Sequence, residues 1–200
     1  MTNRQTEVRN SDGPILECRG IERRFGGIVA VTGVDMVIQP QEIFGLVGPN
    51  GSGKTTLTNA ITGFYPPNVG TIRLAGKDIT GTAPHKVATL GVARTFQNLA
   101  LFNGMSVLDN ILLGRHIHMN PGVFRTAFYW WAAKKEEIEN RKIVEEVIEF
   151  LQLESIRNEL VDGLPIGLKK RVELARALVA EPQMLILDEP MAGMNQEEKG

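Results

Sequence analysis

A glycine-rich stretch between an apolar run and a helix-forming segment most constrains the fold of this chain. It reads GPNGSGKTT at residues 48–56, after IFGLV at 43–47 and overlapping KTTLTNAITG at 54–63. The stretch matches the pattern G-x-x-x-x-G-K-[ST] at Gly48, Gly53, Lys54 and Thr55. A continuous apolar run that ends in glycine is typical of a strand buried on both faces of a parallel sheet. The order strand, loop, helix therefore predicts an α/β fold.

The residue types of this loop suit a phosphate group. Glycines let successive backbone N–H groups turn toward an anion, since a Cβ would obstruct its approach, and the helix N-terminus adds further amides. Lys54 is expected to reach the β- and γ-phosphates of ATP, Thr55 to bind Mg²⁺, and Thr56 to donate to the α-phosphate. The predicted nucleotide-binding loop consists of Gly48, Pro49, Asn50, Gly51, Ser52, Gly53, Lys54, Thr55 and Thr56. The alternative is a glycine-rich turn with a surface lysine.

A second apolar run carries two carboxylates at its end. MLILDEP at residues 184–190 predicts a buried strand followed by Asp188 and Glu189. In α/β sheets, ligands bind beyond the carboxyl ends of the strands. Asp188 is expected to hold Mg²⁺ through water, and Glu189 to polarise the attacking water. Many strands end in acidic residues where they meet solvent, so this pair indicates ATP hydrolysis only in combination with the phosphate loop.

The remaining pattern predicts further strands and a helix-rich region. Strands are expected at 15–19, 34–38 and 91–97, and a hairpin at 71–80 that turns at Ala75-Gly76. Helices are expected at 106–115 and 122–153, and one apolar face of the second contains Ile138, Val144, Val147, Ile148 and Leu151. We expect a flexible tail at 1–14 and a single domain over 15–200. Within it, an α/β core carries a helical subdomain at about residues 98–175.

Composition excludes several classes of protein. With 42% hydrophobic and 22% charged residues, the 200-residue chain is an ordinary globular sequence, and its net charge of −1 argues against general binding to nucleic acid. The polar start lacks the apolar core of a signal peptide, and no apolar run approaches the roughly 18 residues needed to cross a bilayer. We expect any association with a membrane to occur through a partner. Cys18, the single cysteine, is expected to be a small apolar residue of a strand.

These motifs, in this order, resemble those of ABC-type ATPases from residue 15 onward. Phe25 in RRFGG resembles the family's adenine-stacking aromatic residue, and Gln97 in ARTFQN resembles the glutamine that links Mg²⁺ and the γ-phosphate to the membrane subunit. MAGMNQEE stands in the place of the D-loop, with Asn195 where aspartate is usual. The resemblance implies a P-loop NTPase core with a parallel central sheet, an antiparallel β subdomain and an inserted helical subdomain.

The family's LSGGQ signature corresponds to LPIGL, which consists of Leu164, Pro165, Ile166, Gly167 and Leu168. In the family, each ATP lies between the phosphate loop of one subunit and the signature helix of the other. Pro165 has neither the hydroxyl group of the usual serine nor an N–H group. Amides at the helix N-terminus can still face a phosphate, so we expect a functional but weakened signature. The alternative is a helix entry that only packs.

Finer features are similar to the ATP-binding subunits of branched-chain amino-acid importers. These features are ITGFY at 61–65, GVARTFQN at 91–98 and a long insertion at 115–142; importers of urea or short amides share them. The resemblance implies an ATPase that uses ATP and Mg²⁺ to energise import, peripheral on the cytoplasmic face of the bacterial inner membrane. Its implied partners are a second ABC ATPase subunit, identical or different, transmembrane permease subunits and, indirectly, a periplasmic solute-binding protein, and no nucleic acid.

Other observations leave alternatives open. The family has a catalytic histidine after the D-loop, whereas His85, His116 and His118 all precede it, so we expect the sequence to be truncated relative to a longer product. A non-transport ABC ATPase and a catalytically impaired nucleotide-binding module therefore remain alternatives. His116 and His118 are expected in a loop rather than at a metal. The aromatic run 124–131 is expected to pack in a core, or to contact a membrane subunit or lipid headgroups. Residues 169–171 are expected to be the solvated start of a helix.

Overall fold

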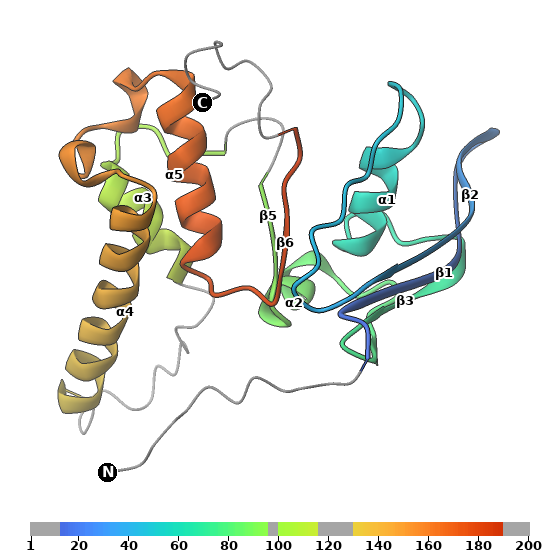
Figure 1. Ribbon diagram of the computed structural model, residues 1–200, viewed down its shortest axis with the longest axis horizontal. Helices are drawn as coiled ribbons and strands as arrows, with labels where there is room; N and C mark the ends of the chain where they lie inside the picture. The colour runs from blue at the N-terminus through green and yellow to red at the C-terminus, as the bar shows by residue number, and fades with distance from the viewer. Residues whose placement is uncertain (1–12, 96–99, 116–129, 190–200) are drawn as a thin grey trace. The chain divides into compact units, whose positions relative to one another are not determined.

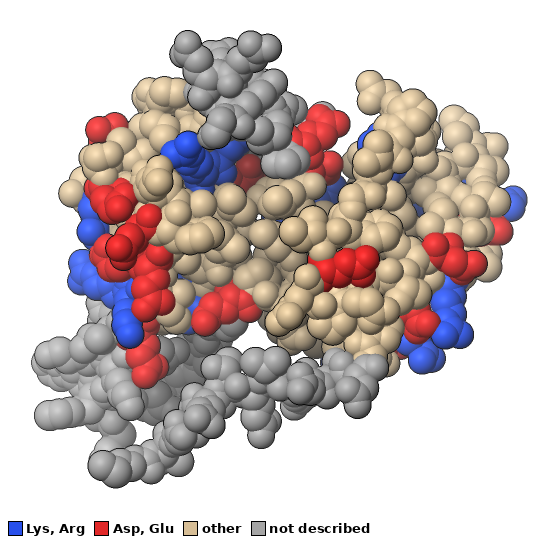
Figure 2. All heavy atoms as spheres, in the orientation of Figure 1, with Lys and Arg blue, Asp and Glu red and all other residues tan. Residues whose placement is uncertain are grey.

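The computed structural model describes residues 13–95, 100–115 and 130–189, with side chains from residue 139 onward in the last range. The chain divides between Val87 and Ala88 into two compact units (Figure 1), and each is described by itself. In the described part of the chain, no helix is both long enough and apolar enough to cross a membrane. Figure 2 shows acidic and basic side chains interspersed over the described part of one face, as is usual for a solvated surface.

The first unit contains an antiparallel sheet with strand order β2-β1-β3-β4. Its strands are β1 (Leu16–Phe25), β2 (Ile28–Ile38), β3 (Val69–Leu74) and β4 (Lys77–Asp78), and its helices are α1 (Lys54–Ile61) and most of α2 (Pro84–Thr89), which crosses the unit boundary. The predicted turn is confirmed, because Ala75 and Gly76 have φ angles of 45° and 78°, as a two-residue hairpin requires.

The core of this unit forms where the central strand β1 meets its neighbours. Leu16 pairs with Ile38 on β2 and with Leu74 on β3, and Cys18 pairs with Met36 and Ile72. The side chains of Leu16, Cys18, Ile21 and Ile72 are at most 1% exposed. Cys18 is therefore a buried strand residue, as predicted, and Leu57, Ala60 and Ile61 form the buried face of α1.

The predicted strand at 43–47 is wrong for this structure. Residues 42–49 have no regular secondary structure, and Ile43 and Val47 are 100% and 93% exposed. A strand buried on both faces needs hydrogen-bonded neighbours, and no described strand pairs with this segment. Its apolar residues alone were insufficient to form the strand, although the helix after the loop forms as predicted.

The second unit joins a small parallel sheet to three helices. Strands β5 (Val92–Arg94) and β6 (Met184–Ile186) pair in parallel, with Val92 opposite Met184 and Arg94 opposite Ile186. The predicted strand β6 is present but only half-buried. Helices α3 (Val107–Leu113), α4 (Trp130–Phe150) and α5 (Ile166–Leu178) pack against one another, with short 3-10 helices at Glu154–Ile156 and Val161–Gly163 (Figure 1).

The apolar face predicted for the long helix α4 is confirmed where side chains are described. Val144 and Ile148 are fully buried, and Val147 and Leu151 pack beside them, whereas the side chain of Ile138 lies outside the described residues. Arg115, which follows α3, binds the Asn140 Oδ1 on α4 at 2.8 and 2.9 Å. It also donates to the Val179 carbonyl oxygen at 2.6 Å, beyond the end of α5. Arg115 thus connects all three helices of this unit.

Candidate functional site

The phosphate loop adopts a backbone that only glycine accommodates easily. Gly51 and Gly53 have φ angles of 82° and 90°, in the left-handed region that other residues seldom occupy. A Cβ added at Gly53 would lie 2.5 Å from the carbonyl oxygen of Ala30 on β2, and one at Gly48 would lie 2.7 Å from the Ser52 Oγ. The glycine positions of the sequence motif therefore coincide with close approaches in the structure.

Lys54 is held inside this loop, at the first position of α1. Its Nζ donates to the carbonyl oxygens of Gly48 at 2.7 Å and Pro49 at 2.9 Å. Thr55 is exposed and Thr56 is half-buried at the start of the same helix. A helix N-terminus, a fixed ammonium group and glycines without Cβ atoms form a cradle suited to the phosphates of a nucleotide. The residues present thus fit ATP.

Phe25 lies at the end of β1 with 40% of its surface exposed. Its ring meets the ring of Tyr65 edge-on, with centroids 5.5 Å apart and planes at 88°. The Arg23 guanidinium carbon lies 4.6 Å from the Phe25 centroid and 5.9 Å from that of Tyr65. These contacts orient Phe25 and leave part of it accessible for stacking. No sequence motif indicates these contacts of Arg23 and Tyr65 with Phe25, because Tyr65 lies in a separate segment of the chain.

Asp188 lies two residues beyond β6 and is fixed by β5. Its Oδ2 accepts a hydrogen bond from the Arg94 Nη2 at 2.7 Å, in an ion pair whose side chains are 6% (Arg94) and 19% (Asp188) exposed. The Asp188 backbone N–H donates to the Thr95 Oγ1 at 3.4 Å. The carboxylate predicted from the sequence thus has a defined orientation. Arg94 and Thr95 were not expected to take part in it.

Glu189 is exposed and has a φ angle of 47°, in the left-handed region. Such a conformation is costly for a residue with a Cβ and often occurs at functional sites. The Lys170 Nζ on α5 donates to the Glu189 carbonyl oxygen at 3.2 Å, which connects this segment to the helix of the LPIGL motif.

The LPIGL motif forms the entry to α5, as predicted. Pro165 is the N-cap residue and makes no side-chain cap, and Ile166, the first helical residue, is 42% exposed. Leu164 and Gly167 are buried, and Leu168 packs against the apolar core. The first turn carries no acidic residue, and Lys169, Lys170 and Arg171 follow, although cations are unfavourable at this end of the helix dipole. This arrangement suits an anion in front of the helix.

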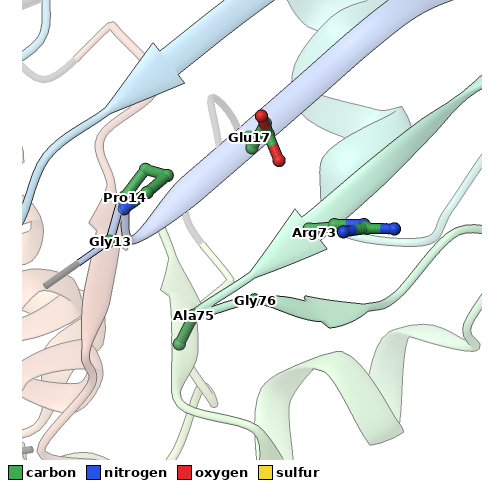
Figure 3. Close-up of a pocket in the computed structure, with 6 residues that line it drawn as sticks. All are labelled: Gly13, Pro14, Glu17, Arg73, Ala75 and Gly76. Atoms are coloured by element: carbon green, nitrogen blue, oxygen red, sulfur yellow. The ribbon is translucent and has the colours of Figure 1, made fainter. Parts of the chain in front are cut away.

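Several predicted residues lie outside the described part of the chain. They are Gln97, the D-loop residue Asn195, His116 and His118, together with the side chains of the aromatic run 124–131. The first unit holds the phosphate loop and Phe25, and the second holds Asp188, Glu189 and LPIGL. A pocket of about 150 Å³ beside Glu17 and Arg73 contains none of these residues (Figure 3).

Comparisons with known proteins point to one family. A family model described as ABC transporter matches residues 31–192. The chain is 40% identical over 185 residues to the high-affinity branched-chain amino acid transport ATP-binding protein BraF of Pseudomonas aeruginosa. It is 38% identical to LivG of Escherichia coli, a protein of the same description. Each alignment covers 92% of this chain and 72% of the relative.

Solved structures extend the likeness to the fold. The ADP conformation of MJ1267, an ATP-binding cassette of an ABC transporter, matches with a TM-score of 0.78 and 33% identity, over 93% of this chain and 72% of that one. CbiO1 of Clostridium perfringens, part of the transporter complex cbiONQ, matches with a TM-score of 0.76 and 29% identity, over 93% and 69%. The predicted fold class is confirmed. The chain therefore belongs to the ABC transporter family, and it is an ATPase.

Proposed function

We propose that this chain is the ATP-binding and ATP-hydrolysing subunit that energises the import of branched-chain amino acids through a membrane ABC transporter. The observation that carries the proposal is the phosphate loop. Its glycines at 51 and 53 have left-handed φ angles, and Lys54 is hydrogen-bonded within the loop, so together they form a site suited to an anion. The names of BraF and LivG support the choice of solute, because both describe branched-chain amino acid transport. Urea or a short amide is the alternative solute.

The loop residues bind and orient the nucleotide in this proposal. Lys54 exchanges the carbonyl oxygens of Gly48 and Pro49 for phosphate oxygens, which keeps its ammonium group hydrogen-bonded in both states. The first amides of α1 donate to the phosphates, Thr56 donates to the α-phosphate, and Phe25 stacks on the adenine ring. Asn50 and Ser52 complete the loop.

The proposed Mg²⁺ site consists of Thr55, Gln97 and Asp188, and Asp188 holds the ion through water. All three residues offer the oxygen atoms that a Mg²⁺ site requires. When bound, Mg²⁺ would neutralise phosphate charge and make the terminal phosphorus more open to attack. Glu189 orients a water molecule and accepts a proton from it. Glu189 as a residue is exposed, which suits this role.

The proposed partners follow from the second unit and from the family. The N-terminus of α5, including Pro165, Ile166 and Gly167, faces the ATP bound by a second ABC ATPase subunit, and Asn195 contributes as the D-loop residue. Gln97 couples changes at the nucleotide site to transmembrane permease subunits at the cytoplasmic face of the inner membrane. The helices α3 to α5 belong to the helical subdomain, proposed to span about residues 98–175 of a domain over 15–200.

Transport by the assembled complex tests this function. The chain is reconstituted with its permease subunits in proteoliposomes, and uptake of labelled leucine and of labelled urea is measured with ATP. We expect uptake of leucine that is lost with Lys54→Met and kept with Lys77→Met, a change at an exposed lysine of β4. Uptake of urea alone would support the alternative solute. ATP turnover without uptake of either would contradict an importer of these solutes.

A further inference from the structure

We propose that Arg94 is a positioning residue of the Mg²⁺ site, which it serves by holding the Asp188 carboxylate in one orientation. The inference rests on the proposed function, which assigns Asp188 to the metal. Arg94 itself would touch neither metal nor nucleotide. Its effect would pass through the ion pair that the Arg94 Nη2 makes with the Asp188 Oδ2 at 2.7 Å.

The parallel pairing of β5 and β6 explains why these two residues meet. Arg94 lies opposite Ile186, the last residue of β6, and Asp188 lies two residues further along the chain. Thr95 continues the pairing, because its N–H donates to the Ile186 carbonyl oxygen at 3.0 Å. The end of β5 thus contacts both the backbone and the carboxylate of Asp188.

The burial of the ion pair restricts its geometry. The Arg94 side chain is 6% exposed, so it cannot exchange its partner for water as a surface arginine would. A hydrogen bond between two ionised groups is also short and strong. With Arg94 bound at Oδ2, Oδ1 is directed away from the ion pair and can accept from a metal-bound water, since a carboxylate accepts at both oxygens.

Residues in the outer shell of a metal site influence metal affinity without touching the metal. Changing such a residue typically weakens metal binding by about 10- to 100-fold. Lysine would keep the positive charge but lose the planar guanidinium geometry that places the Nη2 donor at Oδ2. The inference therefore predicts a graded series, in which Arg94→Lys weakens the metal site less than Arg94→Met.

The experiment measures Mn²⁺ affinity of the ADP complex by electron paramagnetic resonance, and ADP affinity in EDTA by fluorescence. We expect Arg94→Met to weaken Mn²⁺ binding about 10- to 100-fold, with unchanged ADP affinity in EDTA. Arg157→Ala is the matched control, since it removes another ion pair of the second unit, with Glu145. Circular dichroism confirms that each variant is folded, and Arg94→Lys replaces Arg94→Met if the latter is not.

The variant Asp188→Asn distinguishes a failure of the inference about Arg94 from a failure of the proposed function. If Arg94 acts through Asp188, Arg94→Met adds no further loss of Mn²⁺ affinity in the Asp188→Asn background. Unchanged Mn²⁺ binding in Arg94→Met, or an equal further loss in that background, would overturn the role of Arg94. Unchanged Mn²⁺ binding in Asp188→Asn itself would instead overturn the assignment of Asp188 to the metal, and the inference with it.

Discussion

The Lys54 ammonium group donates a hydrogen bond to the Gly48 carbonyl oxygen at 2.7 Å, across the phosphate loop that contains both residues. A second bond to the Pro49 carbonyl oxygen, at 2.9 Å, holds the side chain in the same place. Because these bonds already confine the side chain to the loop, Lys54 loses less side-chain entropy than a mobile lysine would when it exchanges the carbonyl oxygens for phosphate oxygens. We therefore expect Lys54 to contribute to nucleotide affinity.

Replacing Lys54 by Met should weaken ATP binding while the protein stays folded. Each hydrogen bond to a charged group contributes about 1.5–3 kcal/mol, so the dissociation constant should rise at least about tenfold. Titration with a fluorescent ATP analogue measures the change, and Lys77→Met controls for the loss of a surface charge. Equal ATP affinity in the Lys54→Met variant would show that Lys54 does not bind phosphate.

Gly53→Ala should destabilise the first unit, because both the φ angle of 90° and the 2.5 Å approach to the Ala30 carbonyl oxygen exclude a Cβ. Strained backbone of this kind costs on the order of 1–3 kcal/mol. Gly27→Ala is the matched control, since Gly27 follows Gly26 in the β1–β2 turn and a Cβ there meets nothing within 4 Å. Urea unfolding compares the two, and equal free energies of unfolding would contradict the loop geometry.

Ile166→Asp should separate the stability of α5 from its role toward a partner. An acidic residue in the first turn of a helix is favourable by about 0.3–1 kcal/mol. The Ile166 side chain is 42% exposed, so its removal costs little apolar burial. The free energy of unfolding should therefore change little. The same charge would repel a γ-phosphate from a second subunit and weaken ATP-dependent dimerisation by about tenfold.

Analytical ultracentrifugation with ATP measures this dimerisation, in the Glu189→Gln background so that ATP is not consumed. Leu160→Asp is the control, since Leu160 is an exposed apolar residue outside α5. If Ile166→Asp and Leu160→Asp dimerise equally well, the N-terminus of α5 does not face ATP.

Cys18 should make stability fall at alkaline pH. Burial, and secondarily the charge of Glu17, raises the pKa of its thiol from 9.0 to about 12. Between these values the folded state keeps a proton that the unfolded state releases, so the free energy of unfolding falls by about 1.4 kcal/mol per pH unit. Urea unfolding between pH 8 and pH 10.5 measures this slope. The difference between the protein and its Cys18→Ala variant should decrease as pH rises, and a constant difference would contradict the burial of the thiol.

Local patterns in the sequence were sufficient to predict much of the fold. The hairpin at Ala75-Gly76, the face of α4 that carries Val144 and Ile148, and the start of α5 all depend on neighbouring residues, and each is confirmed. The strand at 43–47 was not predictable in the same way. Its formation depends on hydrogen-bonding partners elsewhere in the chain, and the described residues supply none.

The same distinction between local and distant contacts applies to the candidate site. The glycines and Lys54 were predictable, because the spacing within one loop encodes the cradle. The contacts of Asp188 with Arg94 and of Phe25 with Tyr65 join segments that are distant in the sequence, and only the pairing of the strands and the packing of the loops decide them.

The most direct test of the account is the steady-state turnover of Mg-ATP by this chain, compared with that of Glu189→Gln at high protein concentration. Binding of a fluorescent ATP analogue is measured for both proteins in parallel. We expect measurable turnover that is lost in Glu189→Gln, with ATP affinity unchanged, because Glu189 orients and deprotonates the attacking water and does not hold the nucleotide. Equal turnover in the two proteins would contradict the role of Glu189 and the mechanism built on it.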